Sequence, residues 1–277
     1  MDKIVALGVK KKFRLKQSQK ANRSSSASNE VEVLNGLNLR VREGEFLVLV
    51  GPSGSGKSVF LDIIGGLTTA SGGAVYIDDK LVDGPSSKSA YVFQQYALFP
   101  WRTALSNIEF GMENQGIQKE ERTDRAQKWM QKFGLSGFED RFPYQLSGGM
   151  QQRVAIARAL ARNPEVLLMD EPFAALDSQT RETLQEELIR TWEEGERTTV
   201  VFVTHSIDEA VFLADRVVVV TARPAEIKEI IEIDLPRPRD ANTRSSCEFT
   251  ANRHKVWEAL KLEVSRAQQE SQLAAAR

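Results

Sequence analysis

The feature that most constrains this chain is a glycine-rich octapeptide, Gly51–Ser58, whose last two residues are Lys57 and Ser58. It matches the pattern G-x-x-x-x-G-K-[ST] at every fixed position. An apolar run, Phe46–Val50, precedes it, and a helix-like segment, Val59–Ile64, follows it. Because glycines let backbone N–H groups converge at the start of a helix, a strand, loop and helix in this order form an anion site. The sequence therefore predicts a phosphate-binding loop in an α/β fold.

Two side chains of this loop have expected roles. Lys57 is placed to reach the β- and γ-phosphates of a nucleotide, and the Ser58 hydroxyl to take one place on Mg²⁺. A glycine-rich turn with an incidental lysine is the alternative, which the flanking strand and helix disfavour. The other loop residues expected to bind the nucleotide are Gly51, Pro52, Ser53, Gly54, Ser55 and Gly56.

Composition limits the classes of protein that remain. The chain has 277 residues, and its 37 basic and 38 acidic side chains leave a net charge of −1, which argues against a nucleic-acid partner. The single cysteine, Cys247, cannot form an internal disulfide, which suits a reducing compartment. No apolar run approaches the ~18 residues of a membrane-spanning helix, so we expect any membrane role to come through a partner.

The pattern of apolar residues predicts an α/β core. Near-continuous apolar runs suit a mostly parallel sheet that is covered on both faces. Asn35-Gly36 predicts a tight turn between two strands, and the helix-like Thr180–Glu194 lies where a βαβ crossover would place it. Strands are expected at Ile4–Phe13, Val31–Leu34, Leu37–Val41, Phe46–Val50, Val75–Asp78, Ala90–Phe93, Val166–Met169, Thr199–Val203, Val217–Val220 and Glu226–Ile233.

A helical insert, a polar loop and a C-terminal tail are predicted in addition to this core. Helices are expected at Thr103–Asn114, at Lys119–Phe133 and after Ser147 to about Arg162, so a helical insert is predicted at about 95–162. The basic, serine-rich segment at about 16–30 predicts a flexible polar loop, with a transit peptide as the alternative. We expect a nucleotide-binding domain over 1–240 and a C-terminal helical tail over 241–277, with its helix at Phe249–Glu270.

Two carboxylates end one of the apolar strands. Asp170 and Glu171 directly follow Val166–Met169, and ligands in open α/β sheets bind at the carboxyl ends of strands. One carboxylate is expected to hold Mg²⁺ and the other to polarise a water molecule. A solvated turn is the alternative for such a pair when no phosphate loop accompanies it.

The most specific string in the chain is Leu146–Arg153. It predicts a second glycine loop that opens a helix, with Ser147 as the N-cap, and hence a second anion site that lacks a lysine. This string resembles the signature sequence of ABC-transporter ATPases. The order of motifs over about residues 4–222 is also similar to that family: the phosphate loop, Gln94, the signature, Asp170-Glu171, Ala175-Leu176-Asp177 and His205.

The resemblance implies a P-loop NTPase fold in which a mostly parallel sheet is joined by an antiparallel β subdomain and the helical insert. It also implies a head-to-tail dimer with a second copy of the chain. Each ATP would then lie between Lys57 of one subunit and Ser147, Gly148 and Gly149 of the other. Asp177 would couple the two sites across the dimer.

The same resemblance implies roles around the γ-phosphate. Glu171 would be the general base and Asp170 the Mg²⁺ carboxylate, while Gln94 would contact Mg²⁺ or the attacking water and sense a transmembrane partner. His205 would contact the γ-phosphate, and Phe13 would stack on adenine. A structural histidine after a strand and an aromatic residue in the core are the alternatives for these last two.

Two further segments concern the partner and the cargo. The apolar run Tyr96–Thr103 follows Gln94 and predicts a groove for a permease helix, with ordinary packing of the insert as the alternative. Phe99–Thr103 and Leu235–Asp240 resemble the nitrate/sulfonate/taurine importer ATPases. Gln95-Tyr96 departs from that group, which commonly carries Glu-Pro there.

The resemblance thus implies the ATPase subunit of an importer for a small oxyanion. It would work with transmembrane permease subunits and a solute-binding protein, as a peripheral protein on the cytoplasmic face of the inner membrane. Importers of sugars, polyamines or amino acids are one alternative, and a soluble ABC ATPase without a transport role is another. A P-loop small-molecule kinase is a third alternative, but it would not explain Leu146–Arg153.

Overall fold

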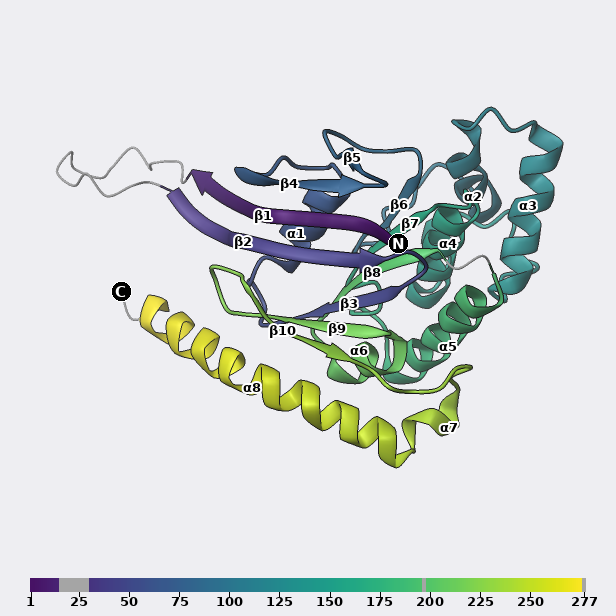
Figure 1. Cartoon of the computed structure of the whole chain (residues 1–277). Coiled ribbons are helices and arrows are strands. Elements are labelled where there is room, and N and C mark those ends of the chain that lie inside the picture. Colours follow the sequence, from purple (N-terminus) through teal and green to yellow (C-terminus); the bar gives the residue numbers. More distant parts are fainter. Residues whose placement is uncertain (15–29, 196–197, 276–277) are drawn as a thin grey trace.

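The structure is a computed structural model that describes residues 1–14, 30–195 and 198–275. Except for Glu30, the polar loop expected at about 16–30 lies outside these ranges. Two sheets organise the described residues, one of six strands in the order β10-β9-β3-β8-β7-β6 and one of four in the order β2-β1-β4-β5 (Figure 1). The expected α/β fold is confirmed.

The six-stranded sheet is parallel except at one edge, where β10 runs antiparallel to β9. Alternate residues of each strand enter two separate cores: Val48 and Phe202 face one, and Leu47 and Val201 face the other. This explains why the central strands are apolar throughout. The strands are β3 (Phe46–Val50), β6 (Ser89–Val92), β7 (Val166–Asp170), β8 (Thr199–Thr204), β9 (Arg216–Val220) and β10 (Ile227–Glu232).

The antiparallel sheet contains the main departure from the sequence prediction. Asn35-Gly36 was expected to turn the chain, but β2 continues from Glu30 to Arg42 beside β1. The register shifts at this point, with Lys11 opposite Leu34 and Val9 opposite Leu37, so the dipeptide forms a bulge that Gly36 accommodates at φ +74°. The strands are β1 (Asp2–Arg14), β2 (Glu30–Arg42), β4 (Gly72–Ile77) and β5 (Lys80–Leu81).

Helices between β6 and β7 form the segment where the insert was expected. Thr103 caps the first of them by accepting a hydrogen bond from the Ser106 N–H. Phe133 is fully buried, and its ring lies 6.0 Å from that of Trp129, four residues earlier in the chain. The elements are α2 (Ala104–Glu113), α3 (Lys119–Lys132), the 3₁₀ helix η1 (Pro143–Gln145) and α4 (Gly148–Leu160).

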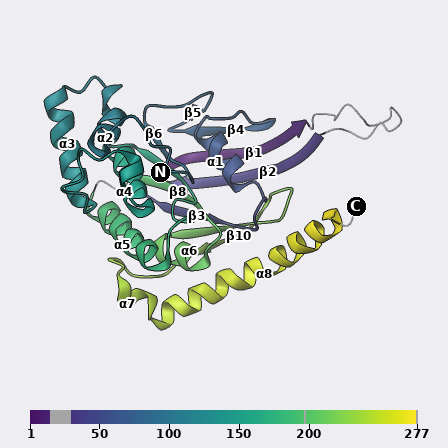
Figure 2. The same ribbon diagram turned by 180° about the vertical axis from the view of Figure 1, so that it is seen from behind.

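The remaining helices cover the parallel sheet. α1 (Lys57–Ile64) packs beside β7 and β8, and α5 (Ser178–Glu194) connects those two neighbouring parallel strands as the predicted crossover. The short α6 (Ile207–Leu213), which the sequence analysis did not predict, packs under β3. After α7 (Ala241–Arg244), the long α8 (Cys247–Ala275) runs along α6, β9 and β10 (Figures 1 and 2). None of the helices in the described ranges has the length and hydropathy that crossing a bilayer requires.

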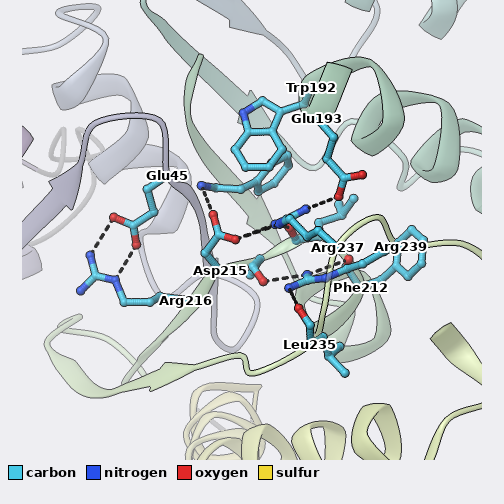
Figure 3. A network of polar contacts seen from close by, with 12 residues as sticks. Glu45, Trp192, Glu193, Phe212, Asp215, Arg216, Leu235, Arg237 and Arg239 are labelled. Carbon is cyan, nitrogen blue, oxygen red and sulfur yellow. Dashed lines mark hydrogen bonds and ion pairs between the residues drawn. The ribbon is translucent and has the colours of Figure 1, made fainter. Parts of the chain in front are cut away.

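Two arginines fasten the segment before α7 to the core (Figure 3). Arg239 is 4% exposed and donates hydrogen bonds to the carbonyls of Phe212, Ala214 and Leu235. Arg237 pairs with Asp215 at 2.7 Å and also reaches Glu193. Because Arg239 satisfies carbonyls that the end of α6 leaves without helical partners, it serves as the C-terminal cap of that helix.

Replacement of Arg239 tests this cap. Arg239→Met should lower the free energy of unfolding by about 2–3 kcal/mol, because buried carbonyls would lose charge-assisted hydrogen bonds. Arg253→Met is the control, since Arg253 is exposed and its ion pair with Asp208 spans 3.7 Å, so it should cost less than about 1 kcal/mol. Urea unfolding followed by circular dichroism would measure both, and equal midpoints would contradict the assignment.

Candidate nucleotide site

The glycine-rich loop joins the end of β3 to the start of α1. Gly56 lies at φ +110° directly before the helix, where a side chain would be strained. A Cβ there would also come within 2.8 Å of Val33, and a Cβ on Gly51 within 2.5 Å of Val220. The loop therefore depends on glycine both for its conformation and for its close fit against β2 and β9.

Lys57 is the cation of this loop. It is 5% exposed, and its Nζ donates to the carbonyls of Gly51 at 2.9 Å and Pro52 at 3.0 Å. Burial lowers the pKa of Lys57, and the negative charges of Glu171 and Asp170 partly offset that effect. The ammonium group is thus held within the loop next to the two carboxylates that the sequence analysis singled out.

Ser58 and Asp170 come together as expected for a magnesium site. The Ser58 hydroxyl donates to Asp170 Oδ1 at 2.9 Å. Burial raises the pKa of Asp170, and the charges of Glu171 and Asp62 add to the rise. A partly buried carboxylate with a raised pKa is stabilised in its ionised form by a bound cation. A hydroxyl and a carboxylate beside a phosphate-binding loop fit Mg²⁺, which takes one or two protein ligands together with phosphates.

Glu171, the residue after Asp170, forms a side-chain pair with His205. Glu171 adopts a left-handed backbone conformation at φ +43°, and its N–H donates to the Val203 carbonyl at 3.0 Å. Its Oε2 lies 3.1 Å from Nδ1 of His205, which follows β8. A non-glycine residue at positive φ is uncommon and often marks a functional position. The sequence analysis placed both residues near the γ-phosphate but did not foresee their direct contact.

A cavity of about 470 Å³ lies over the loop, and eight of the predicted residues line it. Phe13 is among them and is 43% exposed, which disfavours the core-packing alternative for this ring. The sequence analysis missed the other lining residues, Val31, Val33, Val59 and Arg223. The eight predicted residues are Phe13, Ser53, Gly54, Gly56, Lys57, Ser58, Gln94 and Glu171.

The signature residues lie elsewhere. Ser147 caps α4 as predicted, with its Oγ 3.3 Å from the Met150 N–H. A Cβ on Gly148 would come within 2.7 Å of the Tyr96 hydroxyl, and one on Gly149 within 2.7 Å of the Thr180 side chain. None of the three signature residues lines the cavity over the phosphate loop.

Asp177 also lies outside that cavity. It caps α5 by accepting a hydrogen bond from the Thr180 N–H at 3.0 Å. Hydrogen bonding to that N–H is the main cause that lowers the pKa of Asp177. Because Thr180 also contacts Gly149, Asp177 and the signature loop are neighbours in the structure.

Behind His205 lies a buried carboxylate that the sequence analysis overlooked. Glu209 is 5% exposed and accepts a hydrogen bond from the Thr204 hydroxyl at 2.6 Å. Burial raises the pKa of Glu209. Ser206 caps α6 by accepting from the Glu209 N–H, so the Ser-x-x-Glu spacing of a capping box was the signal that could have predicted this helix.

Comparison with known proteins agrees with this geometry. Residues 34–174 match the model of the family described as ABC transporter. The chain is 55% identical over 260 residues to the uncharacterized ABC transporter ATP-binding protein MJ0412 of Methanocaldococcus jannaschii, covering 92% of this chain and 96% of that protein. It is 44% identical over 223 residues to the aliphatic sulfonates import ATP-binding protein SsuB of Bacillus cereus, covering 80% and 86% of the two chains.

Solved structures give the same assignment. The chain resembles a dimeric post-hydrolysis state of the ATP-binding cassette MJ0796 bound to ADP and Pi, with a TM-score of 0.71 and 36% identity over 83% of this chain and 98% of the other. The resemblance that Leu146–Arg153 suggested is therefore confirmed. This chain belongs to the ABC transporter family and is an ATP-hydrolysing, ATP-binding member of it.

Proposed function

We propose that this chain is the ATPase subunit of an importer for a small oxyanion such as nitrate, sulfonate or taurine. The observation that carries the ATPase assignment is that Lys57, Ser58 and Glu171 line one cavity, with Asp170 bonded to Ser58 and His205 in contact with Glu171. The similarity to a sulfonate-import protein supports the cargo class, as do the segments Phe99–Thr103 and Leu235–Asp240.

The residues divide the chemistry among them. Lys57 and the N–H groups of the phosphate loop bind the phosphate oxygens, and Phe13 offers its exposed ring to adenine. Ser58, Gln94 and Asp170 would hold Mg²⁺, which when bound would offset the negative charge of the phosphates. Glu171 orients and deprotonates the attacking water, and His205 holds the Glu171 carboxylate in place through their 3.1 Å contact.

The position of the signature supports a composite site between two chains. Ser147, Gly148 and Gly149 open α4 with N–H groups suited to an anion, yet they do not line the cavity of their own chain. A related cassette forms a dimer that binds ADP and Pi. In a head-to-tail dimer, the signature of one chain closes over the phosphate loop of the other, and Asp177 lies beside it at the boundary.

The docking surface for the permease is the region of Tyr96–Thr103. Here a hollow of about 350 Å³ lies between β6 and the helical segment, and its aromatic lining residues are Tyr91, Phe93, Phe99 and Phe110. Trp101 beside it is 72% exposed. Because Gly148 contacts Tyr96, a helix seated in this hollow would act on the signature as well as on Gln94. The full assembly includes permease subunits and a solute-binding protein on the inner membrane.

Replacement of the general base is the first test. Glu171→Gln should leave ATP binding intact and lower the steady-state ATPase rate by about 10²–10⁴-fold, the usual contribution of a positioned base. ATP-bound dimers should accumulate, because closed sites could no longer hydrolyse their way open. Turnover is measured by phosphate release and dimerisation by size-exclusion chromatography. A variant with near-normal turnover would remove Glu171 from this role.

Mixing two inactive chains tests the composite site. Lys57→Ala and Ser147→Arg chains should each lack ATPase activity, but some heterodimers of the two should regain one working site. The measurement is phosphate release after the chains are mixed, with subunit exchange verified by differently tagged copies. No recovery in demonstrably mixed dimers would mean that each site is complete within one chain.

An exposed aromatic side chain tests the docking surface. Trp101→Asp should abolish copurification with the permease and keep the basal ATPase of the subunit, because truncation of a hot-spot aromatic residue costs about 2 kcal/mol or more. Tyr144→Asp is the matched control, since Tyr144 is 76% exposed but its ring packs on Phe142, whereas that of Trp101 packs on Phe99 of the hollow. Assembly that survives Trp101→Asp would move the docking surface elsewhere.

The cargo is tested with the assembled complex in proteoliposomes. ATP-dependent uptake should be seen with taurine, an alkanesulfonate or nitrate and should be absent with maltose and with neutral amino acids. Uptake of sugars or amino acids alone would replace the oxyanion proposal with one of the other importer classes, and the ATPase assignment would stand.

A further inference from the structure

The turn between β9 and β10 reaches the nucleotide cavity. In the sheet, β9 lies on one side of β3, and β7, which ends at Asp170, lies on the other side. Arg223 lies in this turn, and its Nη2 donates to the carbonyl of Gly54 at 3.2 Å. Arg223 also lines the cavity, together with Lys57 and Phe13. A guanidinium group has five N–H donors, and among the described residues Arg223 gives only the one to Gly54. Donors therefore remain for a ligand in the cavity.

The turn that carries Arg223 is fixed to β2. The Ala225 N–H donates to the Val33 carbonyl at 2.8 Å, and the Ala225 carbonyl accepts from the Asn35 N–H at 3.0 Å. Val33 in turn packs against Gly56 of the phosphate loop. The Thr221 hydroxyl closes the turn by donating to the Pro224 carbonyl. The backbone of Arg223 is thus held at a defined position relative to the phosphate loop.

A buried carboxylate of the C-terminal helix holds the same turn from below. Glu263 on α8 is 2% exposed, and its Oε2 accepts a hydrogen bond from the Ala222 N–H at 3.3 Å. Its Oε1 accepts from Lys228 Nζ at 3.0 Å, and Arg266 lies 3.4 Å away. Although burial acts to raise the pKa of Glu263, these hydrogen bonds and charges outweigh it and lower the pKa. An ionised carboxylate therefore anchors the residue next to Arg223.

We propose that Arg223 is a nucleotide-binding residue that donates hydrogen bonds to the polyphosphate of the nucleotide in its own subunit, and that Glu263 of α8 is its positioning residue. The proposal rests on the cavity over the phosphate loop being the nucleotide site. A planar guanidinium suits phosphate oxygens, and such charge-assisted hydrogen bonds are among the strongest in proteins. Arg223 and Lys57 are the two cationic side chains among the residues that line this cavity.

This arrangement gives the C-terminal helix a direct route to the nucleotide. Glu263 binds the backbone of Ala222, and the next residue, Arg223, contacts Gly54. Because Ala222 and Arg223 are joined by one peptide bond, a displacement of α8 at Glu263 would also move the Arg223 guanidinium. The helical tail is then part of the nucleotide site, although it lies far from the phosphate loop in the sequence.

Binding of ADP and of pyrophosphate to the full-length chain tests the role of Arg223 without hydrolysis. Arg223→Gln should lower the binding affinity for both ligands by about tenfold, the size expected for loss of a charge-assisted hydrogen bond. Isothermal titration calorimetry measures ADP, and competition against ADP measures pyrophosphate. Arg42→Gln is the matched control and should change neither affinity, since Arg42 is exposed and pairs with Glu232 outside the cavity.

Three outcomes of that experiment would overturn the inference. An Arg223→Gln chain that binds ADP normally would remove Arg223 from the site. Weaker binding of ADP together with unchanged binding of pyrophosphate would place the contact on the ribose or the base. The Lys57→Ala chain gives the baseline for a chain without nucleotide binding. If the wild-type chain binds ADP no better than this baseline, the nucleotide site itself is refuted, and the inference with it.

A double-mutant cycle tests the role of Glu263. Glu263→Met keeps the volume but loses the acceptor for the Ala222 N–H, so ADP should bind at least threefold more weakly. The double variant with Arg223→Gln should bind no more weakly than Arg223→Gln alone, because Glu263 acts through Arg223. Additive losses would contradict that route.

Two further variants keep the Glu263 test decisive if Glu263→Met does not fold. Glu263→Gln keeps both the volume and an acceptor oxygen, so it should bind ADP within about twofold of the wild type, and a threefold or greater loss would contradict the role of the hydrogen bond. Glu258→Met on the same helix is the control, because Glu258 is exposed and pairs with Lys261. It should leave ADP affinity unchanged, and a loss equal to that of Glu263→Met would show a general effect of α8.

Discussion

Three neighbouring parallel strands share a hydrogen-bond register in which Val50 pairs with Thr204 and Asp170 pairs with Val203. Each strand ends at this edge and delivers one part of the site: the phosphate loop after β3, Glu171 after β7 and His205 after β8. A slip of one residue would turn every side chain of a strand to the opposite face. The chemistry of the site therefore depends first on backbone hydrogen bonds inside the sheet.

The charges of the site are balanced within that frame. Lys57 is buried beside Asp170 and Glu171, so the cation offsets part of the negative charge that the strand end brings together. Burial still raises the pKa of Asp170, and the nearby charges of Glu171 and Asp62 add to that rise. A cation bound to phosphate, as proposed for Mg²⁺ at Ser58 and Asp170, would offset this negative charge. Burial of unpaired charge is costly, so ligand binding and stability are linked at this position.

Contacts outside the sheet connect the site to the surfaces that partners would use. Gly148 touches Tyr96, and Gly149 touches Thr180 next to Asp177. The signature loop is thus packed between Tyr96 and the start of α5. Arg237 and Arg239 connect the segment before α7 to the residues at the end of α6 (Figure 3). The helix α6 begins two residues after His205.

By itself, the sequence determined the features that arise from near neighbours in the chain. Glycine spacing gave the phosphate loop, apolar runs gave the buried strands, and Ser147 gave a helix start, because backbone conformation and capping act over a few residues. Only the tertiary structure decided which distant residues meet. It made Gly36 a bulge instead of a turn, because β1 and Ala225 supply hydrogen bonds to an extended β2. It also placed Arg223 at the phosphate loop, because contacts between strands and α8 position that turn, and no local pattern records them.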